Sequence, residues 1–128
     1  MMDGRFVVQE HTTPEGVHWD LMLETGQTLT TFRLAERPQD VLRHAVEAVR
    51  IADHAMRFLA YEGPVQKGTG KVRIVERGTY RRLDEREDII TLDVQGAVLQ
   101  GSFTLTWKKG TTWELRATRP RSCGDCHE

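Results

Sequence analysis

Apolar and polar residues alternate most clearly in the first quarter of the chain, where the pattern predicts three consecutive β-strands. The run 6–8 is apolar and rich in β-forming residues, and residues 12–16 supply the threonines, proline and glycine of a turn. Residues 18–24 alternate with a period of two, which is typical of a strand. After a compact turn at 25–27, the β-branched stretch 28–34 completes a hairpin.

The rest of the chain also predicts more strands than helices. Apolar residues at helical spacing predict a short helix around 39–46, followed by a strand over 48–53, and residues 54–61 suit one helical turn. Further strands are expected at 71–80, 89–94, 98–107 and 112–117. Seven or eight short strands with one or two short helices predict a mainly β fold, a small antiparallel β-barrel. We expect residues 1–118 to form a single domain and residues 119–128 a mobile tail.

Composition narrows the class of protein. A chain of 128 residues, 38% hydrophobic and 29% charged, is sized for one soluble domain. It contains no apolar run of roughly 18 residues and no basic N-terminus with a long apolar segment, so we expect a cytoplasmic protein without a membrane span. The net charge of −1 argues against strong non-specific DNA binding, which needs a large basic excess. Any contact with nucleic acid is expected to involve a local cluster of basic residues or to be confined to the end of a nucleic-acid strand.

The clearest candidate chemistry lies in the strand at 18–24. His18 and Asp20 are two residues apart and therefore face the same side of a strand, and the preceding loop can return His11 beside them. Two imidazoles and one carboxylate form a transition-metal site with open coordination positions. The alternative interpretation is that these residues form the polar outer face of an ordinary amphipathic strand.

Two other groups could carry chemistry. His54 ends a predicted strand, so it could lie at the rim of the barrel, although a surface histidine beside a turn has the same pattern. Lys71, Arg73 and Arg77 would share one face of an unbroken strand and could meet a phosphate backbone. Acidic residues follow closely at 84–88, so a solvated charged surface is the alternative.

The C-terminus carries the spacing of a c-type haem attachment motif, Cys123-Gly124-Asp125-Cys126-His127. Haem attachment requires export and a chain folded around the cofactor, whereas this motif ends the chain. Reduced thiols or adventitious zinc binding are the favoured interpretation.

A set of short motifs occurs in a familiar order between Phe6 and Leu115. They are FVVQEH, HWDLMLE, an aromatic strand at Phe32, ADH ending at His54, YEG at 61–63, GTG at 68–70, RGTY at 77–80 and a closing G-x-F-x-L with W-E-L. In this order they resemble the 3′-phosphoesterase domain of bacterial DNA ligase D. The resemblance covers nearly the whole chain.

This resemblance implies a small β-barrel that holds a divalent ion, most often manganese, with zinc or another transition metal as a possible substitute. Such domains remove 3′-phosphates and 3′-terminal ribonucleotides from nucleic-acid ends. Carried over by position, it implies His11, His18 and Asp20 as metal ligands and His54 as a catalytic residue. Gln9 and Glu10 belong to the same motif and are further catalytic candidates, with Lys71 and Arg73 as candidates for substrate binding. The expected partners are DNA or primer 3′ ends and a separate ligase, for a protein that acts as a monomer.

The chain also departs from the family pattern at positions that normally grip phosphate. Met22 stands where the family usually has arginine, Phe58 where it has tyrosine, and Glu36 where it has lysine. The metal half of the implied site is thus retained, while the phosphate-binding half is depleted. Two alternatives follow: a module that binds metal and a nucleic-acid end without hydrolysis, and an iron oxygenase with two histidines and one carboxylate. The phosphoesterase ranks first.

Overall fold

The computed structural model describes residues 3–65 and 70–118, and strands dominate them. The strands are β1 (Asp3–Thr13), β2 (Gly16–Thr25), β3 (Thr28–Leu34), β4 (Val46–Ala55), β5 (Gly63–Pro64), β6 (Lys71–Glu85), β7 (Ile89–Gly96), β8 (Gln100–Lys109) and β9 (Thr112–Ala117). The helices are α1 (Pro38–Val41) and the 3₁₀-helix η1 (Met56–Leu59). Neither helix has the length and apolar composition needed to cross a bilayer.

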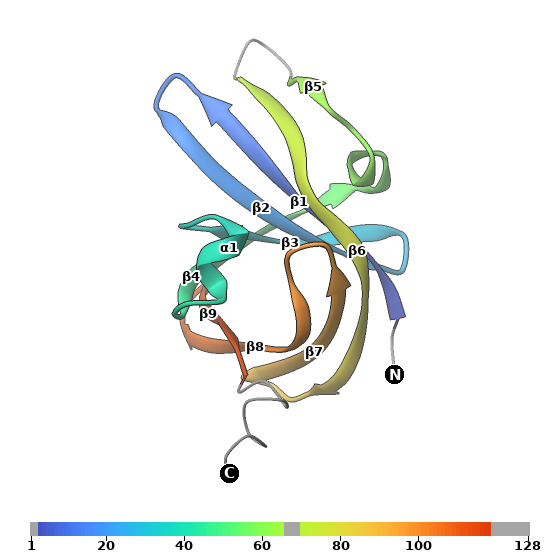
Figure 1. The fold of residues 1–128 in the computed structure, drawn as a ribbon, viewed down its shortest axis with the longest axis vertical. Coiled ribbons are helices and arrows are strands. Elements are labelled where there is room, and N and C mark those ends of the chain that lie inside the picture. Colours follow the sequence, from blue (N-terminus) through green and yellow to red (C-terminus); the bar gives the residue numbers. More distant parts are fainter. Residues whose placement is uncertain (1–2, 66–69, 119–128) are drawn as a thin grey trace.

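Eight of these strands close into an antiparallel barrel in the order β1-β2-β3-β4-β9-β8-β7-β6. Pairing of β1 with β6 completes the ring, and β5 adds two residues to the free edge of β6 (Figure 1). The β1–β2 hairpin and the first part of β6 extend beyond one end of the ring (Figure 1). The expected mainly β antiparallel barrel is therefore confirmed.

The expected helix at 39–46 is too long. Helix α1 ends at Val41, and β4 already begins at Val46. Val46 and Ala48 are fully buried and pair with β9, so closure of the barrel takes residues that helical spacing assigned to a helix. The tail at 119–128, with its two cysteines and histidine, lies outside the described residues.

The barrel interior is filled by alternate side chains of its strands. Phe6 and Val8 of β1 and Leu21 and Leu23 of β2 belong to this main core, and Val41 of α1 joins it. These side chains are at most 4% exposed. The period-two pattern of residues 18–24 thus agrees with the placement of Leu21 and Leu23 on the inward face of β2.

A second, smaller apolar cluster covers part of the barrel's outer surface. We call it the outer cluster: it consists of buried Val7, Met22 and Leu29, against which Met56, Phe58, Leu59 and Ile74 pack. Gln9 fastens the covering segment, because its Nε2 donates to the carbonyl oxygens of Phe58 at 3.0 Å and Tyr61 at 2.9 Å. The polar outer face proposed for residues 18–24 is therefore wrong in part, since η1 shields Met22 from solvent.

Candidate metal centre

Three side chains on the outer face of β1 and β2 converge on one point. His11 Nδ1 lies 3.1 Å from His18 Nε2, and His18 Nε2 lies 3.6 Å from Asp20 Oδ2. One ligand atom from each residue lies within 4.8 Å of the others. The two imidazole rings meet edge to face, with centroids 4.7 Å apart.

The register of the β1–β2 hairpin produces this convergence. Residues 14 and 15 form a two-residue connection between the paired residues Thr13 and Gly16. Counting back from this turn pairs His11 with His18 and places Gln9 opposite Asp20. Directly paired residues share a face of the sheet, and residues two positions apart do so as well. The expected approach of His11 to the His18–Asp20 pair is thus what the structure contains.

Burial and charge prepare these groups for a cation. Asp20 is buried, with 3% of its surface exposed, and Arg33 Nε donates to its Oδ1 at 3.2 Å. Burial lowers the pKa of His18, and the attraction of Asp20 opposes this shift. Electrostatic interactions with Arg33 and His11 lower the pKa of His18 further. A neutral imidazole is the form that binds metal, so the shift favours coordination.

The donor set fits a first-row divalent ion. Nitrogen and oxygen ligands that bind one such ion at about 2.1 Å lie roughly 3.0–3.4 Å from each other. The separations of 3.1 Å and 3.6 Å need only a small adjustment to reach this range. The carboxylate also has one oxygen for each partner: Oδ1 accepts from Arg33, and Oδ2 faces His18. His11, His18 and Asp20 are therefore the residues that could hold a metal.

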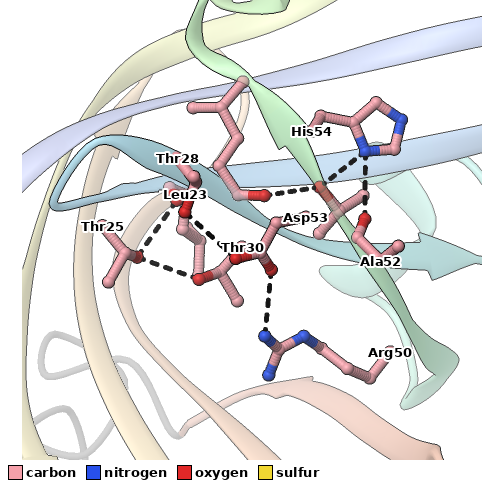
Figure 2. A network of polar contacts seen from close by, with 10 residues as sticks. Leu23, Thr25, Thr28, Thr30, Arg50, Ala52, Asp53 and His54 are labelled. Carbon is pink, nitrogen blue, oxygen red and sulfur yellow. Dashed lines mark hydrogen bonds and ion pairs between the residues drawn. The ribbon is translucent and has the colours of Figure 1, made fainter.

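His54 lies on the same outer face but two strands away, in β4. A bulge between β3 and β4 adds one residue to β4, so that His54 pairs with Leu29 of the outer cluster. Its Nδ1 lies 3.2 Å from the carbonyl oxygen of Ala52 and 3.1 Å from Thr31 Oγ1. A carbonyl oxygen only accepts, so this network assigns the hydrogen to Nδ1. Figure 2 shows the second ring nitrogen, Nε2, turned away from these partners.

The other predicted site residues do not join the cluster. Glu10 alternates with His11 and pairs with Trp19, so it faces the opposite side of β1. There its carboxylate accepts from Arg73 Nε at 2.9 Å and from Trp19 Nε1 at 3.3 Å. Lys71 pairs with Thr12 on the same side as Glu10. Lys71 and Arg73 therefore point away from His11, His18 and Asp20.

A bulge also separates the three basic residues of β6. Val8 pairs with Glu76 while Gln9 pairs with Ile74, so Val75 is an extra residue in β6. Beyond this bulge, Arg77 pairs with Val7 on the outer face. The expectation of one face for all three was wrong, because it required an unbroken strand.

The sequence analysis missed Arg33, which contacts the cluster directly. Its signal was present in the β2–β3 hairpin, where the two-residue turn at 26–27 pairs Asp20 with Arg33. Gly26 adopts a φ of 62°, which suits such a turn and fixes the register.

Comparison with known proteins connects this site to a family. The family model described as the DNA ligase D 3′-phosphoesterase domain matches residues 9–107, a span that includes the cluster and His54. The chain belongs to the DNA ligase D 3′-phosphoesterase domain family. The expected family is therefore confirmed.

Three relatives of this 3′-phosphoesterase domain show how much of a longer protein it represents. The multifunctional non-homologous end joining protein LigD of Mycolicibacterium smegmatis is 28% identical over 125 residues, covering 87% of this chain and 16% of the relative. The LigD DNA repair protein of Mycobacterium tuberculosis H37Rv is 28% identical over 119 residues, with the same coverage. LigD of Pseudomonas aeruginosa is 30% identical over 111 residues, covering 79% of this chain and 13% of the relative. The chain thus spans about one sixth or less of the length of these relatives.

The positions that depart from the family pattern have other contacts in the structure. Met22 is fully buried in the outer cluster, and the Phe58 ring meets the His54 ring edge to face at 5.6 Å. Glu36 lies on the surface and accepts from His44 Nε2 at 2.8 Å. Met22 and Phe58 thus contribute apolar side chains to the outer cluster.

Proposed function

We propose that this chain is a divalent-metal-dependent phosphoesterase that removes a 3′-phosphate or a 3′-terminal ribonucleotide from nucleic-acid ends during DNA end repair. The family match supports an esterase that acts at 3′ ends. The observation that carries the metal-dependent reaction is the convergence of His11, His18 and Asp20 within 4.8 Å. Manganese is the proposed ion, and zinc or another transition metal could fill the same donor set.

In this proposal the three ligands set the charge of the centre. Two neutral imidazoles and one carboxylate leave a bound divalent ion with a net charge of about +1, which attracts a phosphate ester. When bound, the ion supplies Lewis-acid polarisation of phosphorus and a water of lowered pKa. Burial lowers the pKa of His18, which favours the neutral imidazole that can serve as a ligand.

The remaining proposed roles belong to His54 and Gln9. Because Nδ1 of His54 donates to Ala52 and Thr31, its Nε2 is directed away and can hold or deliver the proton of a leaving oxygen. Gln9 acts indirectly, by holding the carbonyl oxygens of Phe58 and Tyr61 over the outer cluster. We therefore propose Gln9 as a positioning residue.

Cleavage of defined ends tests this function. Purified protein with Mn²⁺ is incubated with a labelled primer–template that ends in a 3′-phosphate or a single ribonucleotide, and the products are separated on a denaturing gel. We expect shortening or loss of the phosphate, abolished by EDTA and by Asp20→Asn. Arg86→Gln serves as the matched control that should retain activity, because Arg86, in the connection between β6 and β7, pairs its Nε with an exposed carboxylate, Asp84 Oδ2, at 3.3 Å. Intact substrate in the presence of demonstrably bound Mn²⁺ would remove the enzymatic proposal.

A second candidate is a module that binds metal and a nucleic-acid end without cleaving it. It is favoured by Met22 and Phe58 of the outer cluster, because their apolar side chains offer no hydrogen bond to phosphate. The same experiment separates the two candidates, because a mobility-shift assay on the intact primer detects binding without turnover. A separate ligase remains the proposed partner in either case.

A further inference from the structure

Arg33 borders the candidate metal centre on its solvent-exposed side. It lies in β3 directly opposite Asp20, and its Nε donates to Asp20 Oδ1 at 3.2 Å. The Asp20 side chain is 4% exposed, whereas the Arg33 side chain is 44% exposed. The guanidinium therefore begins at a buried carboxylate and ends in solvent.

The hydrogen-bond capacity of Arg33 is only partly used. Its Nε serves Asp20, while its two terminal nitrogens have no hydrogen-bond partner among residues 3–65 and 70–118. A guanidinium has five donors in a planar fork, and this fork matches the oxygens of a phosphate. Since Asp20 already fixes the inner end of the side chain, less rotational freedom remains to be lost when an anion binds.

The position of Arg33 differs from that of the other charged groups at the cluster. In the described part of the chain, it is the arginine or lysine that forms an ion pair with Asp20, the one acidic residue of the three. Arg73 forms a similar pair, with Nε 2.9 Å from Glu10 Oε1, but on the opposite face of the sheet. The two arginines thus offer the same chemistry in two places, and only one of them borders the proposed metal site.

We propose that Arg33 is the residue that determines specificity for a phosphorylated 3′ end, by donating from its terminal nitrogens to non-bridging oxygens of the terminal phosphate while its Nε keeps Asp20 in place. This inference deepens the proposed function and rests on it. A terminal phosphomonoester presents more negative charge and more free oxygens than an internal diester or a 3′-hydroxyl. The charge-assisted fork of Arg33 therefore selects the phosphorylated end.

A binding experiment without turnover isolates this role. The full chain is titrated in saturating Mn²⁺ against two fluorescent duplexes, one ending in a 3′-methylenephosphonate, whose C–P bond resists hydrolysis, and the other in a 3′-hydroxyl. We expect the wild type to prefer the phosphonate end by about tenfold, the low end for charged hydrogen bonds at an exposed site. Arg33→Gln should reduce the preference to about twofold or less. Arg33→Lys should retain part of it, because the charge remains without the fork, and Arg86→Gln, at a surface ion pair with Asp84, should retain all of it.

A second readout follows the link to Asp20. Titration calorimetry should show about tenfold weaker Mn²⁺ binding for Arg33→Gln, since loss of a partner that orients a ligand typically weakens a metal by this amount or more. Arg86→Gln should bind Mn²⁺ as the wild type does. Thermal melting checks that each variant is folded. If Arg33→Gln does not fold, the binding measurements on Arg33→Lys test the role of Arg33 instead.

The possible outcomes separate this inference from the proposed function. A phosphonate preference that survives in Arg33→Gln, that disappears equally in Arg86→Gln, or that is missing from the wild type overturns the role of Arg33. If the wild type cleaves 3′-phosphates and Arg33→Gln cleaves them with the same KM, the phosphoesterase activity is supported and the specificity role of Arg33 is refuted. If the wild type binds the phosphonate end through Arg33 but cleaves nothing, the role of Arg33 in binding is supported and the phosphoesterase activity is refuted.

Discussion

Glu76 offers a sharp test of how this barrel is held together. It is a carboxylate with 3% of its surface exposed, located in β6 where the β7–β8 turn folds back against it. Its Oε1 accepts from the backbone N–H groups of Arg77 and Ala97, both at 3.0 Å. Its Oε2 accepts from the N–H groups of Val98 at 2.7 Å and Leu99 at 2.6 Å. One buried side chain therefore satisfies four backbone donors.

The cost of replacing Glu76 follows from these four bonds. Glu76→Gln turns one oxygen into an amino group, which faces two N–H donors that it cannot accept from. Leaving a buried donor unpaired costs about 1–3 kcal/mol, so two such donors predict a loss of about 3 kcal/mol in the free energy of unfolding. Glu76→Ala removes both acceptor oxygens and with them all four hydrogen bonds, and at about 1 kcal/mol for each bond the loss is about 4 kcal/mol or more. Both values are large against a total of roughly 5–15 kcal/mol.

Urea denaturation followed by circular dichroism measures these losses. With a slope of about 1.5 kcal/mol/M, Glu76→Gln should lower the urea midpoint by about 2 M, and Glu76→Ala by more. Glu114→Gln is the matched control, because the ion pairs of Glu114 within residues 3–65 and 70–118 are long surface pairs, at 3.4 Å to Arg116 and 3.7 Å to Lys108. Its expected loss is below about 0.5 kcal/mol. A Glu76→Gln midpoint within 0.3 M of the wild type would show that water replaces the carboxylate and that the reasoning is wrong.

Two further predictions concern single ionisable groups. His54→Ala should slow 3′-end cleavage by roughly 10²–10⁴-fold and leave Mn²⁺ binding unchanged in calorimetry; loss of Mn²⁺ binding would make His54 a ligand rather than an acid or base. Glu24 has its pKa lowered to about 2 by hydrogen bonds from Arg5, so its contribution to stability is complete above about pH 4.5 and is lost as the pH falls toward 2. The melting temperature should therefore fall more steeply with decreasing pH for the wild type than for Glu24→Gln. Parallel pH dependences would contradict a stabilising role of the Arg5–Glu24 pair.

Much of the candidate metal centre was predictable because its residues lie on hairpins with short turns. Two-residue turns fix the register of a hairpin, and alternation then fixes the face of each side chain. His11, His18 and Asp20 follow from one such turn, at 14–15. Arg33 follows from the next one, at 26–27, by the same counting. It was overlooked because the third strand was examined for its β-branched residues rather than for the partner of Asp20.

The bulges and the outer cluster were not predictable from periodicity. A bulge inserts one residue and reverses the face of every residue after it, and nothing in an alternating pattern marks the position. For this reason Arg77 lies on the opposite face from Lys71 and Arg73, and His54 pairs with Leu29. The outer cluster depends on contacts of the first three strands with η1 and β6, which lie far from them in the sequence. Met22 consequently seemed to belong to a solvent-facing stripe, although it is fully buried.

The burial of Asp20 also explains why a cation suits this position on the barrel. Only 3% of the surface of Asp20 is exposed, and a carboxylate buried in this way is costly unless a positive group faces it. Arg33 provides that charge for one oxygen only, because its Nε contacts Oδ1. The second oxygen faces His18, whose pKa is lowered by the same burial, so protonation of His18 is a poor source of the missing charge. A metal ion held by Asp20 and both imidazoles would resolve this conflict, since it would supply positive charge without requiring either histidine to be protonated.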